Sequence, residues 1–152
     1  MVQLSAVNTP QFDPVLNRLR DRARPVPPVH QPELAARAVR YAADHPGRRE
    51  HWVGASTTAA LIANALAPGL LDRYLARAGI DAQQDDGPHR VQDRASLWAP
   101  GDATRDLGAH GRFDDEAHEH STQLRASQHH GLLATGGAVL LGAAARALAR
   151  GR

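Results

Sequence analysis

The uneven placement of large apolar side chains along the chain limits where a hydrophobic core can form. Residues 81 to 130 carry only six of them, Val91, Leu97, Trp98, Leu107, Phe113 and Leu124. The aromatic content of the whole chain is 4%. Such a segment buries too little apolar surface to offset the entropy lost on ordering. We therefore expect a folded unit in residues 1–80, a disordered polar linker in 81–130 and a separate tail in 131–152.

The first half of the folded unit shows a strand–helix–strand pattern. Alternating Val2, Leu4 and Ala6 predict a short strand in residues 1–10, which ends at Asn8-Thr9-Pro10. Residues 11–31 contain four prolines and predict a loop. A helix is predicted over residues 32–45, with Pro32 in its first turn, and a second strand over 50–54. We expect the two strands to lie side by side in a parallel sheet, with the helix as the crossover.

Two further helices are predicted after the second strand. One begins at Ser56 or Thr57 and runs to Leu66, and the other covers residues 70–78 after the interruption at Pro68-Gly69. Their apolar residues recur at helical spacing. The residues expected in the buried stripe are Leu61, Ala65, Leu70, Leu71, Tyr74 and Leu75.

The C-terminal tail is apolar, and Gly131 to Ala145 includes no charged residue. As a helix, this stretch would be about 22 Å long, which is short of the ~30 Å hydrocarbon core of a membrane. We expect a helix over 131–149 that is buried or lies on a surface, with membrane association left open. The alternative to an enzyme is therefore a small non-enzymatic adaptor whose C-terminal helix docks on a membrane or a partner.

Amino-acid usage excludes several chemistries. All 18 basic residues are arginine, and there is no cysteine. A catalytic lysine, a P-loop lysine, a disulfide and a thiol nucleophile are therefore ruled out for this chain. Basic residues alternate with 16 acidic ones, so we expect no nucleic-acid partner. The N-terminus has no signal-peptide pattern, which predicts a cytoplasmic protein.

Four segments in this order resemble the C-terminal portion of the short-chain dehydrogenase/reductase family. Ser-Ala-Val-Asn-Thr-Pro at 5–10 is similar to the family's Pro-Gly-x-x-x-Thr strand end, although Ser5-Ala6 replaces Pro-Gly. Residues 31–39 resemble the helix before the last strand, and 51–57 resemble that strand and its exit. Residues 67–77 are similar to a C-terminal extension found in one bacterial branch.

The resemblance implies a fragment of a Rossmann-type α/β fold, with about two strands and three helices, from an enzyme that moves hydride between NAD or NADP and a small alcohol or carbonyl substrate. It implies that Val7 and Thr9 contact the cofactor and that Phe12, Leu16 and Leu19 belong to the substrate loop. The family's glycine-rich phosphate loop and Tyr-x-x-x-Lys motif are absent. We therefore expect this chain alone to bind no cofactor and to be inactive without the missing N-terminal portion.

Histidines and acids cluster near the end of the linker. Asp114 to His120 and the pair His129-His130 are rich in metal donors. This composition has two interpretations, a tail that responds to metal ions and a solvated polar segment. We expect no specific metal site, because two rings in His-x-His share a side only in an extended chain.

Overall fold

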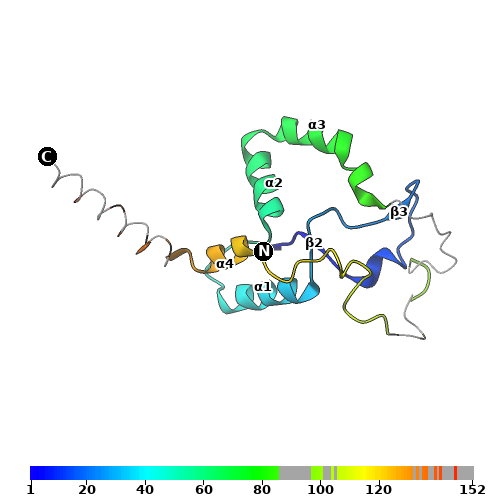
Figure 1. The fold of residues 1–152 in the computed structure, drawn as a ribbon, viewed down its shortest axis with the longest axis horizontal. Coiled ribbons are helices and arrows are strands. Elements are labelled where there is room, and N and C mark those ends of the chain that lie inside the picture. The colour runs from blue at the N-terminus through cyan, green and yellow to red at the C-terminus, as the bar shows by residue number, and fades with distance from the viewer. Residues whose placement is uncertain are drawn as a thin grey trace.

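The computed structural model has α-helices and very short strands in one chain (Figure 1). It describes residues 1–85, 97–100, 104 and 106–131, and single positions in the tail, 133, 135, 136, 139, 141 and 146. Strands in the described part form three separate two-stranded sheets. The chain is therefore of mixed α/β type.

The predicted parallel strand pair is confirmed. Strand β1 (Val2–Gln3) pairs in parallel with β5 (His51–Trp52), and Val2 lies opposite His51. Helix α1 (Pro32–Asp44) lies between them in the sequence. The backbone continues the pairing on both sides, because His51 donates to the Met1 carbonyl and Val53 to the Gln3 carbonyl, both at 2.9 Å.

Helix α1 forms where the sequence predicts it. Pro32 stands in its first turn, where a missing N–H costs nothing, and Glu33 follows at the positive end of the helix dipole. Leu34 and Ala38, one turn apart, are buried, whereas Val39 is exposed. The helix thus packs one face on the strands and leaves the other in solvent.

The expected single strand in residues 1–10 is instead two strands with different partners. Strand β2 (Ala6–Val7) pairs in parallel with β4 (Val29–His30), which lies in the range predicted to be a loop. Strand β3 (Arg22–Ala23) pairs antiparallel with β6 (Gln84–Asp85). Pairs of two residues leave no periodic signal in the sequence, which explains why these strands were not predicted.

Helices α2 (Ala55–Leu66) and α3 (Pro68–Ala78) form an arch that projects from the rest of the molecule (Figure 1). The prediction that their apolar stripe is buried was wrong, because neither helix has a buried residue. Leu70 and Tyr74 are 66% and 65% exposed. The two helices contact each other, and Leu66 and Leu75 are exposed as well.

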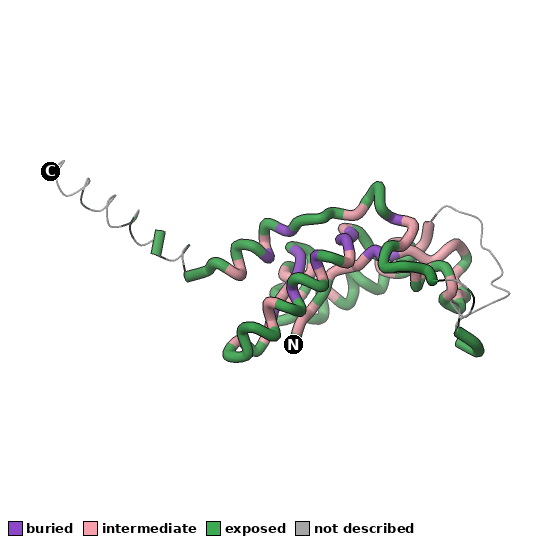
Figure 2. The backbone as a smooth tube through the Cα atoms, turned by 90° about the horizontal axis from the view of Figure 1, so that it is seen from below, coloured by how far each residue is buried: buried purple, intermediate pink, exposed green. Residues whose placement is uncertain are grey.

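The main core contains a residue from the expected linker. Leu34, Ala38, Val53 and Leu124 pack together, and Val2 lies against them. Leu124 belongs to helix α4 (Thr122–Gln128), which Ser121 caps by accepting a hydrogen bond from the Leu124 N–H at 3.2 Å. Buried positions gather where α1, the central strands and α4 meet (Figure 2). Residues 121–128 thus differ from the disordered linker expected there.

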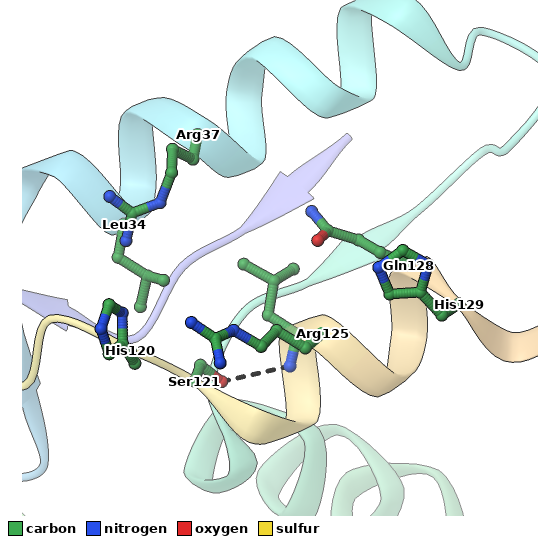
Figure 3. Close-up of a pocket in the computed structure, with 8 residues that line it drawn as sticks. Leu34, Arg37, His120, Ser121, Arg125, Gln128 and His129 are labelled. Atoms are coloured by element: carbon green, nitrogen blue, oxygen red, sulfur yellow. Dashed lines mark hydrogen bonds between the residues drawn. The ribbon is translucent and has the colours of Figure 1, made fainter. Parts of the chain in front are cut away.

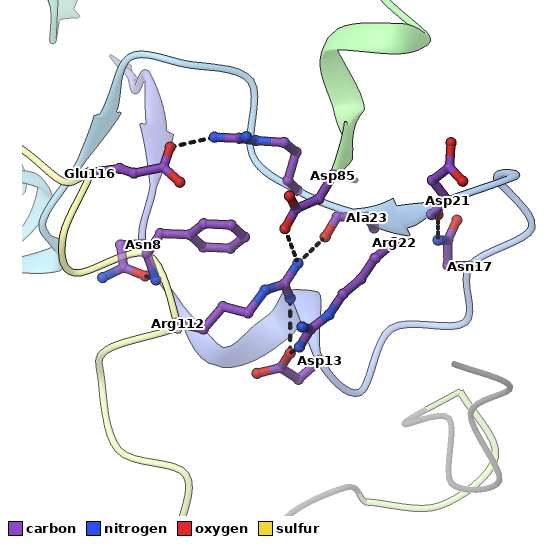
Figure 4. Close-up of polar contacts among 11 residues, drawn as sticks. Asn8, Asp13, Asn17, Asp21, Arg22, Ala23, Asp85, Arg112 and Glu116 are labelled. Atoms are coloured by element: carbon purple, nitrogen blue, oxygen red, sulfur yellow. Dashed lines mark hydrogen bonds and ion pairs between the residues drawn. The ribbon is translucent and has the colours of Figure 1, made fainter. Parts of the chain in front are cut away.

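Residues 106–120 also contact the folded unit, through polar and aromatic side chains. Arg112 donates to the Asp13 carboxylate at 2.9 Å and to the Ala23 carbonyl at 2.8 Å (Figure 4). Its guanidinium lies 4.4 Å from the ring centre of the buried Phe113. Phe113 in turn meets Phe12 edge to face, with 5.8 Å between ring centres. These contacts join residues about a hundred positions apart.

Most of the predicted tail helix, including the greater part of 131–152, lies outside the described residues. The described positions from His130 onward are helical. Among described residues, no helix combines the length and the apolar character needed to cross a bilayer.

Candidate functional site

A cavity beside strand β2 brings together two of the residues singled out from the sequence. It has a volume of about 410 Å³, and both Val7 and Phe12 line it. The 3₁₀ turn at Pro10–Phe12 follows β2 directly and places the Phe12 ring next to the strand. The other wall includes Arg24, the buried Pro25 and Val26. The cavity is therefore largely apolar, with one guanidinium at its edge.

The polar side of this cavity carries the Ser5 hydroxyl. Ser5 Oγ lies 2.7 Å from Nδ1 of His30, a buried residue at the end of β4. Burial lowers the pKa of His30, and the nearby His118 lowers it further. A neutral imidazole can accept the hydroxyl proton or donate to the oxygen. Gly54 allows this approach, because a Cβ there would lie 3.1 Å from Ser5 Oγ.

The other predicted site residues do not line the cavity. Thr9 is half-buried just after β2, at the start of the 3₁₀ turn. Leu16 is exposed and Leu19 half-buried, both further along the loop. The cavity thus combines the predicted cofactor position Val7 with one predicted loop position, Phe12. The cofactor and substrate roles of all five residues stay predictions.

Asn8 is the centre of a polar network that the sequence did not reveal. Its side chain is fully buried, and Nδ2 donates to Gln31 Oε1 at 3.1 Å and to Asp114 Oδ1 at 2.8 Å. Asn8 Oδ1 accepts from the Phe113 N–H at 3.1 Å. In the sequence, Asn8 is the first residue of a turn-like Asn-Thr-Pro, and no local pattern distinguishes it from an ordinary strand end.

A histidine held between two carboxylates lies next to this network. His110 Nε2 is 2.7 Å from Glu33 Oε1, and its Nδ1 is 3.1 Å from Asp114 Oδ1. These contacts raise the pKa of His110, with the Asp114 hydrogen bond the larger cause. The pKa of Asp114 is lowered by Gln31 and His110, and that of Glu33 by its own backbone N–H and by His110. We call Glu33, His110 and Asp114 the His110 clamp.

The described residues do not support the hypothesis that the histidine-rich segment binds a metal ion. Over residues 1–85, 97–100, 104 and 106–131 and the single tail positions, no three His, Cys, Asp or Glu side chains form a group that could hold a metal ion. His30 and His118 lie near each other, with 5.9 Å between ring centres. Their local backbone pairing, in which the His118 N–H donates to the Val29 carbonyl, accounts for the proximity.

The chain is similar to one protein described as an oxidoreductase. It is 29% identical over 80 residues to the uncharacterized oxidoreductase YxnA of Bacillus subtilis (strain 168). The match covers 53% of this chain and 22% of the relative, so the chain corresponds to about a fifth of that protein. No family model matches the sequence. No solved structure matches it either.

Proposed function

We propose that this chain is the C-terminal part of an NAD(P)-dependent oxidoreductase of the short-chain dehydrogenase/reductase family. The observation that carries the proposal is the similarity to an oxidoreductase over 80 residues. The parallel β1–β5 pair on either side of α1 supports it, since adjacent parallel strands with a helical connection are the unit of a Rossmann fold. The whole enzyme would act on a small alcohol or carbonyl compound.

The cavity beside β2 fits one end of a dinucleotide. Its apolar lining, which includes Val7 and Phe12, suits a flat nicotinamide ring. Val7 would hold the carboxamide end and Phe12 would separate the ring from solvent, whereas Thr9, the other predicted cofactor contact, lies outside the cavity lining. The glycine-rich loop that holds a pyrophosphate is absent from this sequence, so the rest of the cofactor needs residues outside it. When bound, the nicotinamide supplies the hydride.

The proton chemistry of the reaction needs residues that this chain lacks. The family's Tyr-x-x-x-Lys motif requires a lysine, and the sequence has none. Tyr41 is stacked on His45 with 3.9 Å between ring centres, and Tyr74 is exposed on α3. Neither tyrosine lines the cavity. The chain by itself is therefore proposed to be inactive.

The proposal is tested with the complete product of the gene, purified from its own host and assayed for oxidation of NADH and NADPH with a panel of small carbonyl compounds. Val7→Trp fills the cavity and is expected to raise the KM for the nicotinamide cofactor at least tenfold. Val39→Ala, at an exposed position of α1, is the matched control and should leave KM unchanged. Nicotinamide turnover that Val7→Trp does not affect would contradict the assignment of this cavity.

A further inference from the structure

A second cavity lies between helices α1 and α4, away from the Val7 cavity (Figure 3). Its volume is about 480 Å³. Leu34 from α1 and Leu124 from α4 form its apolar wall, and both are core residues. The polar residues that line it are Arg37, His120, Ser121, Arg125, Gln128 and His129. None of the lining residues is acidic.

The two arginines of this cavity differ in their surroundings. Arg37 donates to the backbone carbonyl of Glu119 at 2.7 Å, which orients the guanidinium, and its charge contributes to the lowered pKa of Glu33 in the adjacent cavity. Among the described residues, the Arg125 guanidinium forms no hydrogen bond and no ion pair. By contrast, Arg22 and Arg112 both reach the Asp13 carboxylate. The cavity therefore combines the Arg125 guanidinium, which has no carboxylate partner among the described residues, with the Arg37 guanidinium, which also acts on Glu33, and with two imidazoles.

Neighbouring carboxylates are oriented toward other partners or lie in a different cavity. Glu33 and Glu119 line an adjacent cavity of about 360 Å³, which shares Arg37 and His120 with the first. Glu33 is hydrogen-bonded to His110 in the His110 clamp. Arg125 and His129 line only the larger cavity. An anion that enters it would meet cations from both helices.

Ser121 adds a hydrogen-bond donor at the base of the cavity. It is 7% exposed, and its oxygen accepts from the Leu124 N–H, so the hydroxyl proton is available to a ligand. Figure 3 shows the Ser121 oxygen and the Arg125 guanidinium on the same side of the cavity. Guanidinium and hydroxyl donors together are the groups that recognise phosphate oxygens.

We propose that this cavity binds a small phosphorylated molecule. The two arginines and Ser121 would hold the phosphate, and the ligand's uncharged part would cover Leu34 and Leu124. The volume exceeds what inorganic phosphate alone would fill and lies within the range of small-molecule sites. The proposal is independent of the nicotinamide cavity, with which this one shares no residue.

The test is a calorimetric titration of the full chain with inorganic phosphate and, separately, with phenyl phosphate at constant ionic strength. Saturable binding with a Kd of at most about 1 mM is expected, and phenyl phosphate should bind more tightly because its ring contacts the leucine wall. Arg125→Gln and Arg37→Gln should each weaken binding about tenfold. Arg73→Gln, at an exposed position of α3, removes the same charge elsewhere and should change nothing.

Three results would overturn the proposal. They are the absence of saturable binding of both phosphates at concentrations on the order of 10 mM, an equal loss of affinity in Arg73→Gln, and unchanged affinity in Arg125→Gln. Arg125 has no side-chain partner among the described residues, so its variant should unfold at the same urea concentration as the unmodified chain. Urea unfolding of each variant separates loss of the site from loss of the fold.

Discussion

At the scale of single residues, Asn8 connects parts of the chain that no local pattern links. Its side-chain amide holds Gln31 at the start of α1 and Asp114 and Phe113 from the distant segment. Buried amides are costly when unpaired and specific when fully paired. The position of Asn8 therefore determines where residues 111–118 lie against the strands.

Replacement of Asn8 tests this role. Asn8→Ala leaves the buried Phe113 N–H without its acceptor and removes two bonds to Gln31 and Asp114. The free energy of unfolding should fall by about 1–3 kcal/mol, measured by urea denaturation. Asn64→Ala, at an exposed position of α2, is the control and should change it by less than about 0.5 kcal/mol. Equal effects of the two changes would contradict the network.

The His110 clamp makes stability depend on pH in both directions. The pKa of His110 is raised in the folded state, so its contribution is complete below its unfolded value of about 6.5 and is lost as pH rises through the raised value. The pKa values of Glu33 and Asp114 are lowered, so their contributions are complete above their unfolded values near 4 and are lost on acidification. Between these limits the clamp stabilises the fold most.

His110→Gln should therefore flatten the pH dependence of the urea midpoint above about pH 6.5. The exposed side chains of the clamp keep the effect small, because solvent screens their charges. His130→Gln, an exposed substitution outside the clamp, should leave the profile as it is. The predicted sign would be contradicted if the stability of the unmodified protein rose from pH 6.5 to 8 and if this rise were absent in His110→Gln.

At the scale of elements, the sequence predicted α1 well and failed to predict α4. Pro32, Glu33 and the Leu34–Ala38 spacing are local signals, and they fall within α1 itself. Helix α4 has seven residues and a single buried one, Leu124, so its periodicity is too short to recognise. It forms because Leu124 packs on α1 and because Arg48 donates to the Ser127 carbonyl at 2.9 Å.

Leu124→Ala distinguishes a packed α4 from a disordered linker. Removal of this 5% exposed side chain from a small core should lower the free energy of unfolding by about 2–3 kcal/mol. Leu107→Ala, where the side chain is 39% exposed in the same expected linker, should cost much less. Urea denaturation of both variants measures the difference. Identical unfolding curves for the two variants would show that α4 does not belong to the core.

The arch of α2 and α3 shows the opposite error. Both helices form where they were predicted, but the predicted burial of their apolar side chains was wrong. Helical spacing of apolar residues identifies a face, but a covering element must also be present for that face to be buried. Leu70→Gln should therefore change the free energy of unfolding by less than about 0.5 kcal/mol in the isolated chain, measured by urea denaturation. A loss above about 2 kcal/mol would mean that the arch is packed after all.

At the scale of the whole molecule, the order of elements in residues 1–80 was predictable and their long-range partners were not. Strand β1 and strand β5 each carry an alternating or apolar pattern, so their pairing followed from the crossover rule. The contacts of Arg112, Phe113 and Leu124 depend on side chains about a hundred positions away or on another helix. Composition alone assigned those residues to a linker, because composition carries no information about contacts between distant residues.

The candidate site likewise has residues that the sequence predicted and residues that it did not. Val7 and Phe12 were selected from a resemblance, and they do line one cavity. Ser5, which lines the cavity, and His30, which lies 2.7 Å from the Ser5 hydroxyl, come from two segments without any shared motif. The arginines of the second cavity are likewise 88 positions apart in the sequence, at 37 and 125. Pairings of this kind arise only when the chain folds.

The central claim, that this chain is part of a longer oxidoreductase, is tested most directly by the DNA immediately upstream of the Met1 codon. Translated in frame, it should continue without a stop and encode a glycine-rich phosphate loop followed by Tyr-x-x-x-Lys. That result would identify the residues that bind the pyrophosphate of the cofactor and those that transfer the proton, both of which the proposed site beside β2 needs. An in-frame stop codon followed by a ribosome-binding site directly before Met1 would contradict the claim.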